Sequence, residues 1–281
     1  MSQRTSQRIA FAILTTLAVI VVVPIVAVVA YIVIQGLGAI NWEFLTAFPR
    51  DGMRQGGILP AIIGTVVLTF GTAIVSLPIA VGAAIYLAEY ARDTWLTRGI
   101  RLAIINLAGI PSVVYGLFGL GLFVLFLGLG TSIVAGSLTL GLMTMPIVIS
   151  TAEEALLTVP QRFRVVSRSL GASQWQTVRS VVLPNALPGI LTGVILGLER
   201  AAGETAPILF TVAAFYLPQL PHSPLDQTMA LPYHLFVIST QVPGMPLEVQ
   251  YGTALVLLIL VLSMNLVATI LRSRFRRRRQ W

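Results

Sequence analysis

The sequence predicts an all-α, polytopic membrane protein with six transmembrane helices and both termini in the cytoplasm. Composition gives the first indication, because 56% of the 281 residues are hydrophobic and only 10% are charged, whereas a soluble domain carries about 25% charged residues. The length of the uncharged stretches gives the second indication, and the distribution of the arginines gives the third. An apolar surface of this extent needs lipid around it.

Long stretches of the chain carry no charged residue, and five of them mark the predicted spans. They are residues 9–42, 55–88, 102–152, 180–198 and 249–271. Since a span needs about 20 apolar residues, the stretch 102–152 has room for two helices joined by a hairpin near 128–132. The predicted helices are therefore 10–34, 59–87, 103–127, 133–151, 186–212 and 250–271.

The first predicted helix, 10–34, is a retained anchor rather than a signal peptide. It is too long for the apolar core of a signal peptide, and no clear small-residue cleavage site follows it. Residues 1–58 therefore form an N-terminal span with an extracytoplasmic segment. Prolines within the spans are expected to be tolerated where neighbouring helices satisfy the freed backbone groups. These are Pro24, Pro60, Pro78, Pro111 and Pro146.

The arginines set the orientation. All 18 basic residues are arginine, and 15 of them fall on one side of the predicted bundle, leaving Arg50 and Arg54 opposite and Arg200 within a span. Cytoplasmic loops carry an excess of basic residues, so the arginine-rich side is cytoplasmic. Its arginines are Arg4, Arg8, Arg92, Arg98, Arg101, Arg162, Arg164, Arg168, Arg179, Arg272, Arg274 and Arg276 to Arg279.

The closing segment, residues 272–281, is then a topological anchor that also meets anionic membrane lipid. A nucleic-acid-binding tail is the less favoured interpretation, and we expect no nucleic-acid partner. The chain has no cysteine, which excludes a disulfide framework and a thiolate metal site. His222 and His234 lie near proline-rich sequence and are poor metal ligands, so we expect no metal.

The cytoplasmic loop 152–185 predicts a helix, a tight turn and a second helix. Pro160 suits the first turn of a helix, and Gly171 suits the residue just past a helix end. Ser173 has capping-box spacing from Gln176 and starts the second helix, which Pro184 ends.

The first of these helices carries an apolar face. Phe163, Val166 and Leu170 recur at spacings of three and four residues, which places them on one side of the helix. An apolar face on a short cytoplasmic helix needs a surface to pack against. That surface belongs to a partner protein or, alternatively, to the chain's own helix ends or to lipid.

The second half of this loop resembles the EAA loop of ABC-importer permeases. That pattern reads E-A-A, three residues, Gly, nine residues, Ile, any residue, Leu-Pro. Here Gly171 and nine residues precede the segment Val181–Pro184, while the E-A-A positions hold Val165, Val166 and Ser167, so the glutamate is missing. The resemblance implies that the loop inserts into a cleft of an ATPase subunit. The implied coupling residues are Arg162, Phe163, Val166, Ser167, Leu170, Gly171 and Ala172.

The chain from about residue 56 onward resembles the phosphate-importer permeases, of the PstA type. The segments that carry the resemblance are "GGILPAIIGTVVLT" (56–69), "AAIYLAEYA" (83–91), "AGIPSVVYGLFG" (108–119) and "RAAGETAPILFT" (200–211). The resemblance implies a type I ABC-importer permease fold, with residues 59–281 as the permease core, in a prokaryotic inner membrane. The implied partners are a paralogous PstC-type permease, two copies of a PstB-type ATPase and a PstS-type extracytoplasmic phosphate-binding protein.

The chain itself contains no G-x-x-x-x-G-K-[ST] sequence, which binds nucleotide phosphates in many ATPases. It is therefore expected to be no enzyme and to need no cofactor, with ATP used by the partner ATPase. Six helices with one charged stripe supply half of a translocation pathway.

Charged residues lie inside the fifth predicted span. Glu199, Arg200 and Glu204 are surrounded by apolar sequence, and charges in such positions face the bundle interior or water. If 186–212 is one helix, Arg200 lies about 20 Å from the cytoplasmic end, at ~1.5 Å per residue. That depth is past the midpoint of a ~30 Å hydrocarbon core.

The same helix predicts a stripe of small and charged residues. Gly189, Gly193 and Gly197 share one face with Arg200 and Glu204, and glycines at this spacing let another helix approach closely. The stripe should therefore point at a partner helix or an aqueous pathway.

Two interpretations of these charges remain open. Arg200 and Glu204 are four residues apart and can neutralise each other as a structural ion pair, which leaves Glu199 unexplained. Alternatively, the guanidinium handles an anion, because its paired planar donors fit phosphate oxygens and it stays charged in a dry site. A nearby carboxylate would then aid release or accept the proton of hydrogen phosphate. In that interpretation Glu199, Arg200, Glu204 and Thr205 line the substrate pathway.

Other functions compete with a phosphate importer. One alternative is a permease for another oxyanion, such as sulfate, molybdate or phosphonate, although the resemblance carried by "GETAP" argues against it. An ion-coupled secondary transporter would also place carboxylates in the membrane, although such proteins usually carry both repeats in one chain. A membrane scaffold or sensor without transport is the third class, and its function would not depend on Arg200.

Overall fold

The fold is helical because a chain in hydrocarbon must satisfy its backbone polar groups internally, and a helix does so within one segment. The computed structural model describes residues 3–277. Within that range five helices are long and apolar enough to cross a membrane, and a bent helix pair makes up to six. The continuous helices are α1 (Gln3–Gly36), α3 (Leu59–Ile85), α6 (Ile133–Leu157), α9 (Leu183–Gly203) and α12 (Leu247–Arg277).

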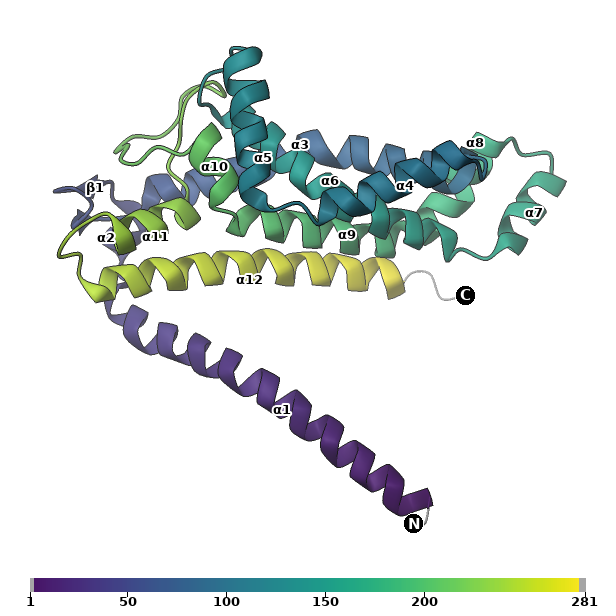
Figure 1. Ribbon diagram of the computed structural model, residues 1–281, viewed down its shortest axis with the longest axis horizontal. Coiled ribbons are helices and arrows are strands. Elements are labelled where there is room, and N and C mark those ends of the chain that lie inside the picture. The colour runs from purple at the N-terminus through teal and green to yellow at the C-terminus, as the bar shows by residue number, and fades with distance from the viewer. Residues whose placement is uncertain (1–2, 278–281) are drawn as a thin grey trace.

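The six predicted spans correspond to these elements, with their ends shifted. The starts predicted at residues 59 and 133 are confirmed. The first helical turn of α1 and the last described turn of α12 lie toward the same end of the long axis as α7 and α8 (Figure 1). We call this the cytoplasmic end. The predicted anchor at 272–281 lies partly outside the described residues, since it includes 278–281.

The third predicted span, 103–127, is wrong as a single straight helix. The chain forms α4 (Trp95–Ala108) and α5 (Ser112–Gly119), which continues as the π-helical segment η3 (Leu120–Phe126). The direction of the chain bends by 102° between the two arms. Pro111 causes the break, because it has no N–H to donate and disfavours helical backbone at the residue before it. Pro24, Pro78 and Pro146 lie inside continuous helices.

The fifth predicted span, 186–212, differs at both ends. At its start, α8 (Gln174–Thr177), the π-helical segment η4 (Val178–Val182) and α9 form one continuous helical stretch, so Pro184 does not end the second loop helix. The wider π turn precedes Pro184 and accommodates its missing donor. At its other end, Gly203 closes α9, and a separate short helix, α10 (Ala206–Thr211), follows.

The centre of the bundle is α6, which packs along α3 on one side and α9 on the other. A Cβ added at Gly193 would lie 2.7 Å from the Thr151 Cβ, and one added at Gly197 would lie 2.9 Å from a Val148 methyl group. The predicted close approach of a helix to the glycine stripe is therefore confirmed, and its partner is α6. The helix α1, by contrast, diverges from the bundle (Figure 1) and has no buried residue in its most apolar window.

The two larger apolar clusters of the described residues occupy the two ends of the bundle. One gathers at the cytoplasmic end between α3, α6 and α9 and includes Leu87, Leu156, Val159 and Val182. The other extends toward the opposite end, where it includes Phe44, Leu140, Met229 and Leu231.

Short elements cover the extracytoplasmic end. They are η1 (Leu37–Ala39), α2 (Trp42–Thr46), β1 (Pro49–Arg50), β2 (Gln55–Gly56) and α11 (Leu231–Thr240). The strands β1 and β2 form an antiparallel hairpin.

Replacing Gly193 by alanine should destabilise the bundle by about 1–3 kcal/mol, the usual cost of overpacking a tight contact. The added methyl group would collide with the Thr151 Cβ on α6. Thermal unfolding of the purified protein in detergent measures the loss. Gly82→Ala on α3 is the matched control, because no atom lies within 4 Å of its added Cβ; equal unfolding temperatures for the two variants would contradict the packing role.

Candidate functional site

The pathway residues predicted on the fifth span lie where α9 ends. Gly203 is the last residue of α9, and Glu204 is already extended, with φ −77° and ψ 137°. Pro207 lies in the first turn of α10 and has no N–H for the carbonyl four residues earlier. The segment "GETAP" is therefore a break between two helices, and the predicted continuous helix is wrong here.

Arg200 and Glu204 nevertheless meet across this break. The Arg200 Nε donates to the Glu204 Oε1 at 3.2 Å, and the side chains are 33% and 19% exposed. This is a single bond, and among residues 3–277 the two terminal nitrogens of Arg200 have no hydrogen-bond partner. The donor edge that would match two oxygens of one anion is therefore unused by the ion pair.

Glu199 faces a different neighbour. It lines an apolar groove of about 180 Å³ between α9 and α12, together with Leu198, Met264 and Ala268. Its Oε1 is buried and has no hydrogen-bond partner among the described residues. The structure thus brings Arg200 and Glu204 together and places Glu199 on another face of α9.

Thr205 lies in the break itself and is half-buried. Its backbone carbonyl accepts a hydrogen bond from the Leu209 N–H at 3.1 Å, which holds the first turn of α10. Its position next to Glu204 keeps it beside the Arg200–Glu204 pair.

The cytoplasmic loop forms the predicted helix, glycine turn and second helix. The first helix is α7 (Gln161–Ser169), and Gly171 adopts φ +86°, a conformation that favours glycine. The Gly171 N–H donates to the Arg168 carbonyl at 2.9 Å and the Ala172 N–H to the Ser167 carbonyl at 3.3 Å. Ser173 caps α8 with the predicted capping box to Gln176.

The apolar face of α7 is only partly covered by the chain. Phe163 packs against the cytoplasmic cluster, and the Arg162 guanidinium lies over its ring at 5.5 Å. Val166 and Leu170 are 58% and 84% exposed, so the chain's own helix ends do not cover them. Val165 on α7 and Trp175 on α8 are exposed apolar side chains as well. This exposed surface is suited to a protein partner at the cytoplasmic end.

Ser167 faces inward from α7. Its hydroxyl lies 3.0 Å from the Thr177 hydroxyl on α8, a hydrogen bond that closes the two helices on each other. Ser167 and Ala172 are half-buried, so both belong to the turn's internal bonding rather than to its exposed surface.

A buried ion pair behind α7 was not anticipated from the sequence. Arg164 and Glu89 meet at 2.6 Å, and their side chains are only 7% and 3% exposed. The two residues are 75 positions apart, and no local pattern links them. The only signal is that Glu89 follows a long uncharged stretch at the end of the second span.

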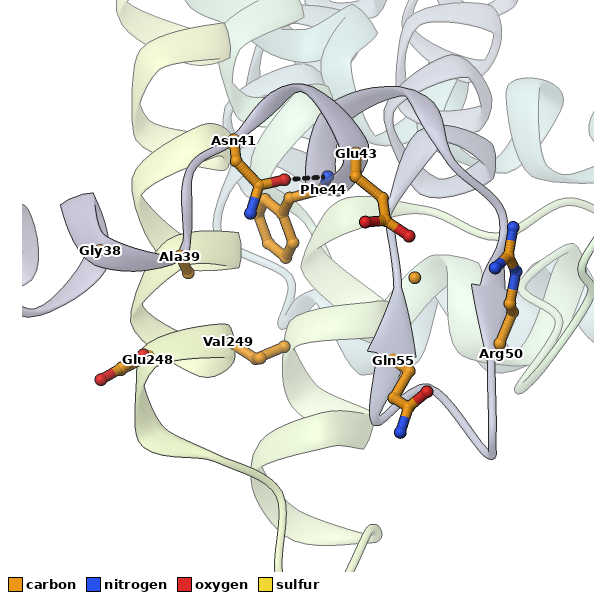
Figure 2. A pocket seen from close by; sticks show the side chains of 10 residues that line it. Gly38, Ala39, Asn41, Glu43, Phe44, Arg50, Gln55, Glu248 and Val249 are labelled. Carbon is orange, nitrogen blue, oxygen red and sulfur yellow. Dashed lines mark hydrogen bonds between the residues drawn. The ribbon is translucent and has the colours of Figure 1, made fainter.

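The extracytoplasmic end carries an open, polar pocket of about 400 Å³ between α2, the β hairpin and the start of α12 (Figure 2). Asn41 caps α2 by accepting a hydrogen bond from the Phe44 N–H at 2.8 Å. Charges of both signs line the pocket, from Glu43, Arg50 and Glu248. A pocket of mixed charge on this face is suited to a polar protein surface more than to one small ion.

Another loop at this end, between α10 and α11, is organised by Asp226. Its carboxylate accepts hydrogen bonds from the backbone N–H groups of His222 at 2.9 Å and Ser223 at 2.8 Å. These bonds lower the pKa of the Asp226 carboxyl. The loop therefore keeps its negative charge.

The sequence of this chain is similar to a protein family and to several individual proteins. The family model described as "Binding-protein-dependent transport system inner membrane component" matches residues 80–281. The chain is 33% identical over 284 aligned residues to the probable ABC transporter permease protein YqgI of Bacillus subtilis, with 95% of each chain covered. It is 32% identical to the probable phosphate transport system permease protein PstA of Methanocaldococcus jannaschii, covering 88% of this chain and 86% of that one.

Among solved structures, a bacterial ABC transporter involved in the import of the acidic polysaccharide alginate contains a chain of similar fold. The TM-score is 0.70 at 13% sequence identity, covering 96% of this chain and 98% of that chain. At this sequence identity the likeness concerns the path of the backbone alone.

Proposed function

This chain belongs to the family of binding-protein-dependent transport system inner membrane components, and we propose that it is the permease subunit of an ATP-driven phosphate importer. It is a multi-pass protein of the cytoplasmic membrane with the helical fold of type I ABC-importer permeases. The observation that carries the substrate class is the similarity to a phosphate permease over most of the chain.

The family places ATP hydrolysis on a separate subunit and substrate delivery on a binding protein. In our proposal, the complex contains two PstB-type ATPases, and one of them docks at the cytoplasmic end of this chain against Val166, Leu170 and Gly171. A PstS-type protein delivers phosphate at the extracytoplasmic end, where the polar pocket beside Glu43 lies. A paralogous PstC-type permease supplies the second half of the pathway.

The chemistry of the pathway rests on Arg200. Its terminal nitrogens are unused by the Arg200–Glu204 bond, so they are available to two oxygens of phosphate while Glu204 keeps the guanidinium oriented. A charge-assisted pair of this kind binds an oxyanion more firmly than neutral donors do. The negative charge of Glu204 opposes that binding and speeds release, which suits a site that phosphate occupies only in transit.

The experiment that tests the substrate class is uptake of radiolabelled phosphate by vesicles that hold the full complex. Unlabelled phosphate should compete, and an equal concentration of sulfate should not. Sulfate is fully ionised at neutral pH and lacks the proton of hydrogen phosphate. Uptake of labelled sulfate with no uptake of phosphate would reassign the chain to another oxyanion importer.

The polypeptide alone is expected neither to hydrolyse ATP nor to move phosphate. Its sequence contains no nucleotide-binding loop of the G-x-x-x-x-G-K-[ST] type, and it supplies half of a pathway. Vesicles containing only this chain, with ATP inside and labelled phosphate outside, provide the measurement. Phosphate accumulation in these vesicles would point instead to a secondary transporter.

A further inference from the structure

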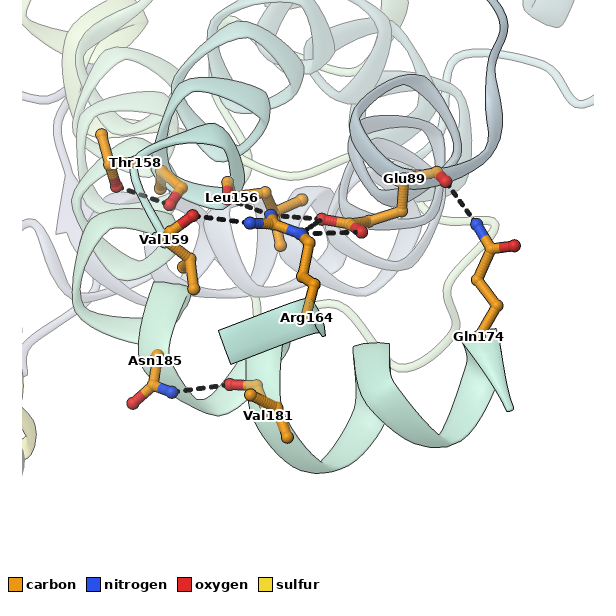
Figure 3. A network of polar contacts seen from close by, with 9 residues as sticks. Glu89, Leu156, Thr158, Val159, Arg164, Gln174, Val181 and Asn185 are labelled. Carbon is orange, nitrogen blue, oxygen red and sulfur yellow. Dashed lines mark hydrogen bonds and ion pairs between the residues drawn. The ribbon is translucent and has the colours of Figure 1, made fainter. Parts of the chain in front are cut away.

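The cytoplasmic ends of three helices meet at one buried ion pair (Figure 3). Glu89 belongs to the π-helical segment η2 (Tyr86–Tyr90), which extends α3, and Arg164 belongs to α7. The Arg164 Nη2 lies 2.6 Å from the Glu89 Oε1, and its Nε lies 3.1 and 3.2 Å from the two carboxylate oxygens. Arg164 therefore binds the Glu89 carboxylate through two donors on one edge of its guanidinium, rather than through a single contact.

The remaining donors of Arg164 reach α6. Its Nη1 donates to the Val159 carbonyl at 2.5 Å, and its Nη2 also donates to the Leu156 carbonyl at 2.9 Å. These carbonyls lie at and just past the end of α6, where backbone acceptors lack helical partners and attract a positive charge. One guanidinium thus joins α7 to the ends of both α3 and α6.

The second loop helix is fixed to the same point. The Gln174 Nε2, at the start of α8, donates to the backbone carbonyl of Glu89 (Figure 3). The Glu89 side chain therefore bonds to α7, and the Glu89 backbone carbonyl bonds to α8. Around this junction α7 is bonded to α8 by the Ser167–Thr177 contact, while Val166 and Leu170 face outward.

We propose that Arg164 and Glu89 are a positioning pair that transmits movement of α7 to α3 and α6, and through them to the pathway. The inference rests on the proposed function, because it takes the ATPase as the source of that movement. The route is continuous: α3 and α6 both pack against α9, which carries Arg200. The residues of a buried junction that is held by several hydrogen bonds move together. In an exposed ion pair, water would compete for the same hydrogen bonds.

Lysine at position 164 should fail to replace arginine. Its ammonium keeps the charge but is a compact point donor, which cannot span a carboxylate and two backbone carbonyls as the planar fork does. Arg164→Lys therefore separates the geometry of the junction from its charge. Glu89→Gln removes the carboxylate charge while keeping the shape of the side chain.

The matched control is an exposed ion pair at the same end of the molecule. Arg98 binds Asp93 at 2.8 Å, and the two side chains are 68% and 66% exposed. Exposed pairs contribute little to stability, so Asp93→Asn and Arg98→Gln should leave transport and ATP hydrolysis unchanged.

The first measurement is phosphate transported per ATP hydrolysed, in reconstituted complexes adjusted to equal amounts of bound ATPase. Arg164→Lys and Glu89→Gln should recruit the ATPase, because the exposed surface of α7 is retained, and should hydrolyse ATP. The phosphate-to-ATP ratio should fall roughly tenfold, within the range that single positions contribute to coupling between sites. A ratio equal to that of the wild type and the control variants would overturn the proposal.

The second measurement follows the junction itself. The chain has no cysteine, so spin labels can be placed at Tyr86→Cys on η2 and Ser169→Cys on α7 without further changes. The distance distribution should be narrow in the otherwise unaltered chain, with and without ATP, and broad in Arg164→Lys. A narrow, unchanged distribution in Arg164→Lys would also overturn the proposal.

The two measurements separate this proposal from the proposed function. If the unaltered complex takes up no phosphate under any condition, the importer assignment fails, while the spin-label distances still decide whether the pair positions α7. If the unaltered complex transports normally and the variants retain both the ratio and the narrow distances, only the positioning role fails.

Discussion

Replacing Arg200 by lysine is expected to lower phosphate uptake roughly 10- to 100-fold, the effect of losing one charge-assisted hydrogen bond. Lysine retains the charge but not the paired planar donors, and it is more strongly hydrated. Because the Glu204 carboxylate takes only the Nε of Arg200, the lost function would be that of the two terminal nitrogens. Uptake normalised to the amount of assembled complex is the measurement.

The double change Arg200→Met with Glu204→Gln separates the two interpretations of the pair. If the pair only stabilises the break between α9 and α10, each single change leaves one charge alone in a partly buried position and destabilises the protein. The double variant should then recover folding and transport together. If Arg200 serves the anion, the double variant should fold and assemble yet remain inactive, and full recovery of uptake would disprove the anion role.

The second large effect is expected at Gly171. Its backbone has φ +86°, and no atom lies within 4 Å of an added Cβ. Within the chain, any loss on substitution therefore comes from the backbone and not from a collision. Valine in this region should cost about 1–3 kcal/mol of strain and reshape the turn between α7 and α8. We expect Gly171→Val to insert into the membrane normally but to lose ATPase recruitment and uptake.

Asparagine is the matched control at the same position. Asparagine adopts the left-handed conformation far more readily than β-branched residues do, so Gly171→Asn should recruit the ATPase and transport nearly as well as the unaltered chain. Co-purification of the ATPase with each variant gives the comparison. A valine variant that recruits the ATPase as well as the asparagine variant would contradict a docking role for this turn.

The topology could be predicted from the sequence because hydrocarbon allows so few arrangements. The length of an uncharged stretch shows where a membrane span fits, and the arginines show which end of the span is cytoplasmic. The starts of α3 at Leu59 and of α6 at Ile133 could be predicted to the residue. The bend between α4 and α5 was missed for the same reason. The hydropathy of residues 103–127 shows that the segment is apolar. It carries no information on the change of chain direction at Pro111.

The candidate site was predictable where its contacts are local. Arg200 and Glu204 are four residues apart, and the pair forms even though the helix ends before Glu204. Gly171 and Ser173 were found from the preferences of single residues for caps and turns. The junction of Glu89 with Arg164 depends instead on how α3 and α7 lie in space, and no spacing along the chain encodes that.

The π-helical segment η4 has a consequence for how this chain is compared with others. A π turn holds one more residue than an α turn, so Val178–Val182 acts as a one-residue insertion between the docking helices and α9. Because the wider turn absorbs that residue locally, deleting it would restore an ordinary α turn and leave α8 nearly unrotated about the axis of α9. A deletion within the regular part of α9 would instead rotate α8 by about 100° and turn Arg164 away from Glu89. This short segment therefore buffers changes of length, and relatives that are one residue shorter here would still present the same side of α7 to the same partner.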